Sequence, residues 1–213
     1  MKKMRKSNAG FSLIEVAIAI VVIGLLASFT IKGGQLIQSA RLNSVYDQVT
    51  TFKVATQLFV EKYGFLPGNL PDAANVLKEG IESGSGNGQI NSLEDSKRFW
   101  QHLIASGLLT TELVNGNPPS KIGGYFYVSN NLEGLEGTWV VLSANTTDNR
   151  NFKGALTPEN AYSIDRNHDT GDPTTGDIRA SKGSGASGEI ISGSKYNFKN
   201  KNKDCVLKFK IFD

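Results

Sequence analysis

The chain has 213 residues, 39% of them hydrophobic and 20% charged, which suffices for one modest domain with an apolar core. Its formal charge of +3 arises from a basic start, which contains Lys2, Lys3, Arg5 and Lys6. The chain after this start has the other 19 of the 23 basic residues and all 20 acidic residues. The remaining chain is almost neutral, which argues against nucleic acid as the main partner.

An apolar run at 11–31 follows the basic segment 1–10 and contains a single charged residue, Glu15. Its 21 residues make a helix of about 31 Å, which can cross a hydrocarbon core of about 30 Å. The basic flank predicts a cytoplasmic leader and a translocated C-terminal part. Ala9 and Gly10 precede the run, whereas a secretory signal peptide is cleaved after it. Cleavage here would keep the span on the mature chain; a signal anchor that retains its leader is the other interpretation.

The residues KSNAGFSLIEVAIAIVVIGLLA around this start closely resemble the processing site of type IV pilins and type II secretion pseudopilins. In that family a prepilin peptidase cuts after the glycine and methylates the new N-terminal phenylalanine, and the acid that follows serves assembly. The resemblance implies that Gly10 precedes the cut, that Phe11 becomes the methylated N-terminus and that Glu15 is the assembly acid. It also implies a pilin-like α+β fold, with a long N-terminal helix packed on a small antiparallel sheet.

Glu15 has a physical reason to need a partner, because a carboxylate in a membrane span costs about 2.5–3.5 kcal/mol at the helix centre and less near its end. After cleavage, the Phe11 amine of the same subunit or of a neighbour could pair with this carboxylate. Removal of one member of a desolvated ion pair costs several kcal/mol. We therefore expect Glu15 to set the register between subunits, the alternative being a carboxylate that merely lies at the membrane interface.

Beyond the span, the segment 32–63 predicts a continuation of the same helix as an amphipathic half. Its apolar residues recur in steps of three and four, which places them on one helical face that we expect to pack on the chain's own domain. They are Leu42, Val45, Val49, Phe52, Thr56, Phe59 and Tyr63. Gly24 and the Gly33-Gly34 pair are places where the helix could bend.

Residues 64–213 are predicted to form the globular α+β domain, with Gly64 ending the long helix. Asp72 is predicted to cap a short helix up to Leu77, and a glycine- and serine-rich loop spans 80–92. A second helix is expected at 93–106, in which we interpret His102 as a partly exposed histidine.

The sheet signals begin with a hairpin of strands 124–128 and 138–143, both rich in aromatic and β-branched residues. A short helix is expected at 161–164 and a strand at 177–180. The Gly- and Ser-rich stretch 181–194 predicts mobility, and the alternating residues 204–212 predict a final strand.

Five side chains with oxygen ligands follow that short helix, namely Asp165, Asn167, Asp169, Asp172 and Asp177. Alternating ligands can converge on calcium when the backbone coils around the ion, and the resemblance supplies a precedent in the major pseudopilins. The segment departs from the EF-hand pattern, with Thr170 and Gly176 where that pattern has glycine and glutamate. The alternative is that these residues only form turns.

No nucleophile, phosphate-loop or metalloprotease motif is found in the sequence, so we expect no enzyme. Cys205 is the single cysteine, and its lack of a partner favours a pseudopilin or minor pilin over disulfide-bearing pilins. The resemblance implies a single-pass protein of the bacterial inner membrane with a periplasmic domain, which then enters a filament in the periplasm or at the cell surface. The implied partners are prepilin peptidase, copies or homologous pilins, and an inner-membrane assembly platform. The alternative is an anchored periplasmic binding domain that does not polymerise.

Overall fold

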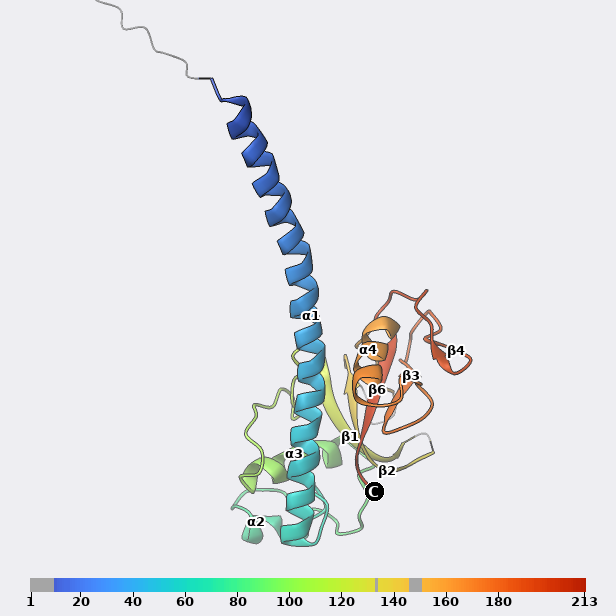
Figure 1. The fold of residues 1–213 in the computed structure, drawn as a ribbon. Helices are drawn as coiled ribbons and strands as arrows, with labels where there is room; N and C mark the ends of the chain where they lie inside the picture. Colours follow the sequence, from blue (N-terminus) through green and yellow to red (C-terminus); the bar gives the residue numbers. More distant parts are fainter. Residues whose placement is uncertain (1–9, 133, 146–150) are drawn as a thin grey trace, which may run out of the picture. The chain divides into compact units, whose positions relative to one another are not determined.

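The computed structural model describes residues 10–213 except for 133 and 146–150 (Figure 1). The chain divides into two compact units, Met1–Ala40 and Arg41–Asp213, with the boundary inside the first helix. The helices are α1 (Leu13–Tyr63), α2 (Ala73–Val76), α3 (Leu93–Ala105) and α4 (Pro158–His168). The strands are β1 (Tyr125–Leu132), β2 (Leu135–Ser143), β3 (Ile178–Lys182), β4 (Ile191–Ser192), β5 (Lys195–Tyr196) and β6 (Cys205–Phe212).

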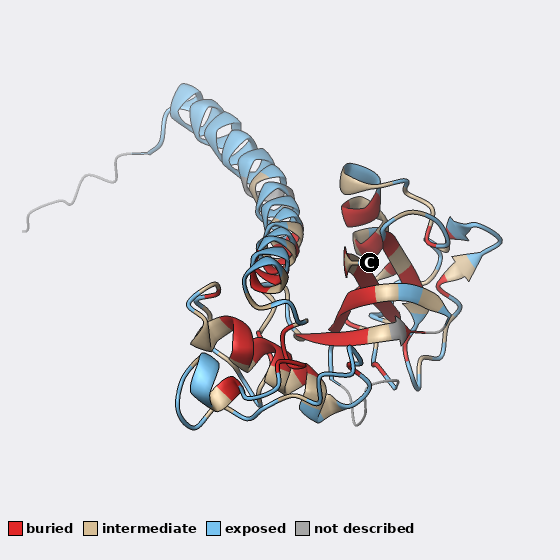
Figure 2. Cartoon of the chain, turned by 90° about the horizontal axis from the view of Figure 1, so that it is seen from below, coloured by how far each residue is buried: buried red, intermediate tan, exposed pale blue. Residues whose placement is uncertain are grey.

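Helix α1 confirms the predicted long N-terminal helix and remains helical through Gly24 and the Gly33-Gly34 pair. It is long and apolar enough to cross a membrane, and no residue of its most apolar window is buried. From Leu42 onward the helix buries one face, as Figure 2 shows. The predicted stripe is buried from Leu42 to Phe59, and Tyr63 is half-buried, so the stripe belongs to the core of the second unit.

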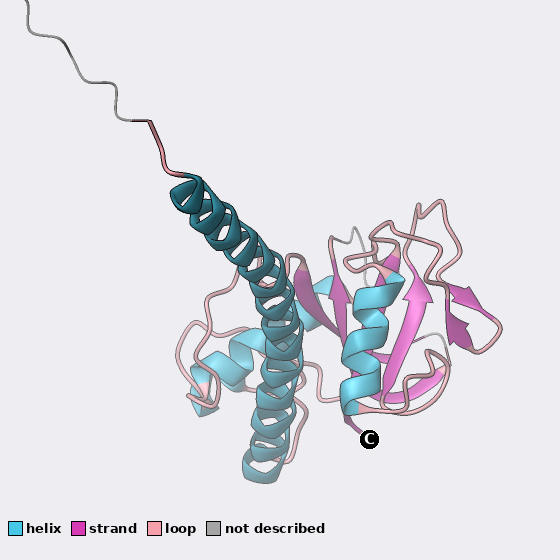
Figure 3. Ribbon diagram, turned by 45° about the horizontal axis from the view of Figure 1, so that its top comes forward, coloured by secondary structure: helices cyan, strands magenta, loops and turns pink. Residues whose placement is uncertain are grey.

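The described residues of the second unit form a four-stranded antiparallel sheet in the order β1-β2-β6-β3, beside a two-stranded pair of β4 and β5. The predicted hairpin and final strand are confirmed, and β1 and β2 extend almost to the turn. Strand β6 pairs on both sides, with β2 and with β3, so the C-terminal strand occupies the interior of the sheet. Helix α4 connects β2 to β3 and lies over the strands in Figure 3.

Phe52 joins three elements of the core through aromatic contacts. Its ring meets Trp100 of α3 at 4.7 Å between centroids and Phe126 of β1 at 5.2 Å, both in edge-to-face geometry. All three rings are buried, and such pairs stabilise a core beyond the area that they remove from water. This cluster fastens the second half of α1 to the sheet.

Two details of the first loops differ from the sequence-based expectation. Asp72 precedes α2 as predicted but has φ 59° and makes no capping bond to the backbone. The Ser83 hydroxyl accepts the Ala73 N–H instead, at 2.9 Å.

His102 is fully buried rather than partly exposed. Its Nδ1 accepts the Gly68 N–H at 3.0 Å, so Nε2 carries the proton and donates to the Glu82 carbonyl at 2.8 Å. The imidazole of His102 therefore joins two loops. The spacing of residues around His102 in the sequence could not predict this contact, because both partners are distant in sequence.

Helix α4 is longer than the predicted 161–164. Thr157 caps its start by accepting the Asn160 N–H at 3.3 Å, and Pro158 occupies the first turn, where it needs no donor. Ala161, Ile164 and Asp165 face inward and are buried. Burial of this face extends the helix across residues that the sequence suggested were a loop.

The stretch 181–194, expected to be mobile, is held by specific contacts in the structure. Gly183 donates its N–H to the Asp204 carbonyl at 2.7 Å, and Ile190 is buried. A Cβ at Gly183 would collide with the backbone of Gly154, so glycine here permits two loops to touch. Gly183 and Gly188 therefore serve close packing, whereas a Cβ at Gly185 or Gly193 would meet no atom within 4 Å.

We expect Phe52→Ala to lower the free energy of unfolding by about 3–5 kcal/mol, because it empties the junction of α1, α3 and β1. Val54→Ala, on the same helix at a residue that is 48% exposed, is the matched control and should change it by no more than about 0.5 kcal/mol. Urea unfolding of the full chain in detergent, followed by the fluorescence of Trp100 and Trp139, measures both. Equal decreases in the two variants would contradict this assignment of the core.

Candidate processing and assembly site

The segment from Gly10 to Glu15 contains the turn that begins α1. Gly10 and Phe11 precede the helix, and the Ser12 hydroxyl accepts the Ile14 N–H at 3.2 Å. In return, Glu15 Oε2 accepts the Ser12 N–H at 2.7 Å. This arrangement resembles a capping box, except that the Ser12 hydroxyl accepts from Ile14 rather than from Glu15, and it satisfies donors that the first helical turn leaves free. Glu15 thus stabilises the start of its own helix.

Ser12 is a helix-capping residue that our sequence analysis missed. The signal was present as Ser12-Leu13-Ile14-Glu15, which has the S-x-x-E spacing of a capping box directly before an apolar run. The side chains around this cap are exposed; Phe11 is 87% and Leu13 88% accessible. The site therefore combines a carboxylate that accepts the Ser12 N–H with an exposed apolar surface.

The family model of the prokaryotic N-terminal methylation motif matches residues 5–31, which include the whole of this site. The chain carries the N-terminal methylation motif. A solved structure that resembles the chain is the major type IV pilin PilA1 from Clostridium difficile, with 14% identity, a TM-score of 0.42, and coverage of 83% of this chain and 98% of the pilin. No curated protein is significantly similar in sequence.

Gly10, Phe11 and Glu15 all lie within the residues that the motif matches. The basic residues at positions 2, 3, 5 and 6 lie outside the described residues. The pilin-like fold class is also confirmed in its components, a long N-terminal helix and an antiparallel sheet domain.

The structure places the five residues considered for calcium on α4 and in the turns that follow it. Asp165 and Asn167 lie on α4, where two positions are about 200° apart around the axis, so their side chains diverge. Asp169 accepts the Ile178 N–H at 2.8 Å, and Asp172 accepts the Thr174 N–H at 2.8 Å. No cluster of three His, Cys, Asp or Glu residues suited to a metal occurs among the described residues. The loop that calcium would need is replaced by helix and turn.

Asp165 has a structural role instead, at the contact between α4 and β5. Its carboxylate is fully buried and accepts the Tyr196 O–H at 2.8 Å and the Gly171 N–H at 2.9 Å. Burial raises the pKa of Asp165, while the two hydrogen bonds oppose this shift. Burial and the same hydrogen bond raise the pKa of Tyr196 above its usual value, so Tyr196 remains a donor.

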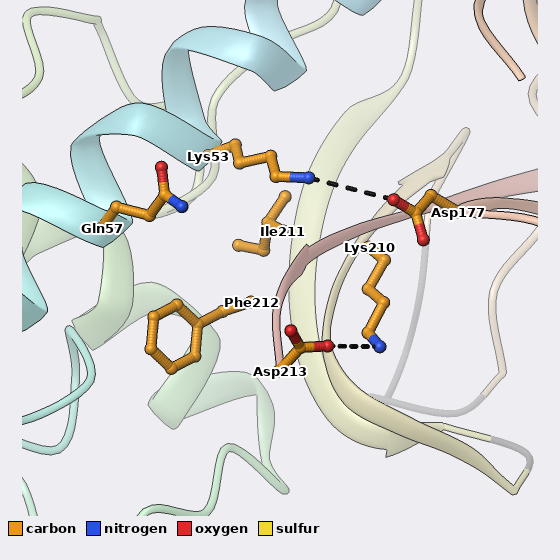
Figure 4. Close-up of a pocket in the computed structure, with 7 residues that line it drawn as sticks. All are labelled: Lys53, Gln57, Asp177, Lys210, Ile211, Phe212 and Asp213. Atoms are coloured by element: carbon orange, nitrogen blue, oxygen red, sulfur yellow. Dashed lines mark ion pairs between the residues drawn. The ribbon is translucent and has the colours of Figure 1, made fainter.

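A groove of about 340 Å³ lies between α1 and the end of β6, and Figure 4 shows its lining residues. Lys53 faces Asp177 at 3.9 Å, and Lys210 pairs with Asp213. The acids of both pairs are largely exposed to solvent, where such interactions contribute about 0–1 kcal/mol. Each lysine in the groove thus faces an acid, so the groove presents no surplus of one charge to a ligand.

The two histidines and the cysteine are placed for structure. Burial lowers the pKa of His102, which keeps it neutral as the bridge between loops. Burial likewise lowers the pKa of His168, whose ring stacks on Tyr46 of α1 at 3.8 Å between centroids. Cys205 is buried at the start of β6, and burial raises the pKa of its thiol, which leaves little reactive thiolate.

Asp165 gives the fold a predictable dependence on pH. Because its pKa is raised on folding, its stabilising contribution is complete below the unfolded pKa of about 4 and is lost as the pH rises through the folded pKa. We expect the melting temperature of the wild type relative to Asp165→Asn to fall as the pH increases from about 4 to about 7. Thermal scans of both full-length chains measure this difference, and parallel curves would contradict the buried carboxyl.

Proposed function

We propose that the chain is a structural subunit of a type IV pilus-like filament or a type II secretion pseudopilus. In this proposal prepilin peptidase cuts after Gly10 and methylates Phe11, and the product assembles through its N-terminal helix. The observation that carries it is the match of the methylation motif to residues 5–31, on a helix that continues into a folded domain. The absence of a possible internal disulfide favours a pseudopilin or minor pilin.

The exposed apolar part of α1 supports both steps of this proposal. Large apolar side chains from Phe11 to Phe29 are exposed, so they need lipid before assembly and other apolar helices after it. The basic leader keeps the N-terminus on the cytoplasmic side and the domain periplasmic. The chain would therefore start as a single-pass protein of the bacterial inner membrane and be extracted by an assembly platform into a filament of copies or homologues.

Glu15 supplies the specificity of assembly in this proposal. Cleavage after Gly10 creates an amine on Phe11, next to the Ser12 N–H that already donates to the Glu15 carboxylate. The carboxylate thus lies near the new N-terminus of its own chain and can also accept the amine of a neighbour. In an apolar bundle either pairing is desolvated and strongly favours the register in which it forms.

The first test concerns processing. We expect the protein from its native envelope to begin at Phe11 with one added methyl group, and Gly10→Val to retain the full leader. A Cβ at Gly10 meets no atom within 4 Å, so this substitution leaves the fold intact and isolates the requirement of the peptidase. Intact-mass measurement of both proteins decides the matter. A native chain that still begins at Met1, with an active peptidase present, would favour an anchored domain that does not polymerise.

The second test concerns assembly, and three variants separate charge from helix capping. Glu15→Ala removes both the charge and the bond that Glu15 accepts at the start of the helix. Glu15→Gln removes the charge but keeps an oxygen that can accept this bond. Ser12→Ala removes only the serine cap, which is worth about 1 kcal/mol. We expect all three to be processed, and both Glu15 variants to lose most of their filaments because a desolvated pair worth several kcal/mol is broken. Ser12→Ala should retain them. Filament yield by sedimentation and microscopy is the measurement, and normal yield from Glu15→Gln would refute the role of the charge.

A further inference from the structure

The segment 195–203, which we call the lysine segment, concentrates positive charge in a chain that is otherwise almost neutral. It reads KYNFKNKNK, with four lysines in nine residues and no acid. All four lysines are exposed in the structure. They are Lys195, Lys199, Lys201 and Lys203.

Backbone and side-chain contacts hold the lysine segment against α4. Tyr196 is buried and donates its hydroxyl to Asp165 on α4. Asn197 donates its backbone N–H to the Ile190 carbonyl at 2.8 Å, directly beyond the pairing of β4 with β5. The segment is therefore a defined surface of the second unit rather than a free tail.

The asparagines between the lysines direct their polar groups back into the segment. Asn197 accepts the Lys199 N–H at 3.2 Å, and Asn200 accepts the Asn202 N–H at 2.8 Å while donating to Asp204. These bonds fold the chain into successive turns. The lysines, whose side chains take no part in these bonds, remain in solvent.

Aromatic rings lie among these charges. Phe198 is 45% exposed although it is a large apolar side chain, and its ring lies 5.1 Å from that of Tyr162 on α4. The Arg166 guanidinium lies 5.9 Å from the Tyr162 ring centroid. A supported, partly open aromatic ring beside several cations is the combination that binds the bases and phosphates of single strands.

Most of this charge is not neutralised within the chain. Lys201 pairs with Glu159 at 2.8 Å, but both side chains are more than 60% exposed, so the pair contributes only about 0–1 kcal/mol. Asp204 is engaged by the Gly188 N–H and by Asn200. In the part of the chain that the structure describes, no acid forms an ion pair with Lys195, Lys199 or Lys203.

We propose that the lysine segment, together with Tyr162 and Arg166, binds single-stranded nucleic acid. The lysines contact successive phosphates, and an unpaired base stacks on Phe198. A duplex exposes the face of a base for such stacking only at its ends. The small net charge of the whole chain is compatible with this binding, because the positive charge is concentrated in the lysine segment. The inference does not depend on filament formation and holds equally for an anchored domain.

The test measures binding of a fluorescent 20-residue oligo-dT to the full chain in neutral detergent, by anisotropy at several salt concentrations. A triple variant, Lys195→Gln with Lys199→Gln and Lys203→Gln, should flatten the slope of log K against log salt by about 2, at about 0.7 for each phosphate that is no longer neutralised. The matched control changes three exposed lysines on other elements to Gln, namely Lys62, Lys78 and Lys121. The basic leader is common to all variants, so differences between them report the segment.

Phe198→Ala distinguishes nucleic acid from polyanions in general. We expect it to weaken oligo-dT binding at least fivefold while leaving competition by inorganic polyphosphate unchanged. The proposal is overturned if the triple variant behaves like its control. It is also overturned if Phe198→Ala binds oligo-dT normally, or if duplex DNA of the same length binds as tightly, since stacking would then contribute nothing.

Discussion

The structure depends on a change in the environment of α1 along its length, from exposed to partly buried in the domain. Its apolar residues are exposed on all sides up to Phe29, whereas from Leu42 onward a single stripe is buried by the domain. Each large side chain in that stripe contributes about 1.5–3 kcal/mol by burial, which fastens the helix to the sheet. The part of α1 before Leu42 gains no such burial from its own chain. Its apolar side chains therefore need lipid or other helices to be removed from water.

Buried polar groups then position the loops that surround this core. His102 joins the loops at Gly68 and Glu82, and Asp165 joins α4 to β5 through Tyr196. Each polar side-chain atom of His102 and Asp165 has a hydrogen-bond partner, which matters because an unsatisfied buried group costs about 1–3 kcal/mol. Loops rich in glycine and serine are thereby ordered, and the surface that carries the lysine segment becomes part of the fold.

The predictions that succeeded rest on spacing within a short stretch of chain. The stripe from Leu42 to Phe59, the hairpin and the final strand each repeat with the period of their own element. The predictions that failed concern residues whose neighbours are distant in sequence. The structural role of Asp165 could not be found locally, because its donor Tyr196 lies 31 residues later in the chain. Ser12 was missed although its local S-x-x-E signal was present.

The amino-acid sequence by itself determined the methylation motif within residues 5–31, the apolar span and the periodicity of the helix and strands. These properties depend on the order and spacing of neighbouring residues, which the sequence states directly. Only the tertiary structure decided that β6 lies inside the sheet, that His102 is buried and that the glycines at 154 and 183 serve close contact. These depend on which distant segments meet, and that is set by the burial of the whole core rather than by local pattern.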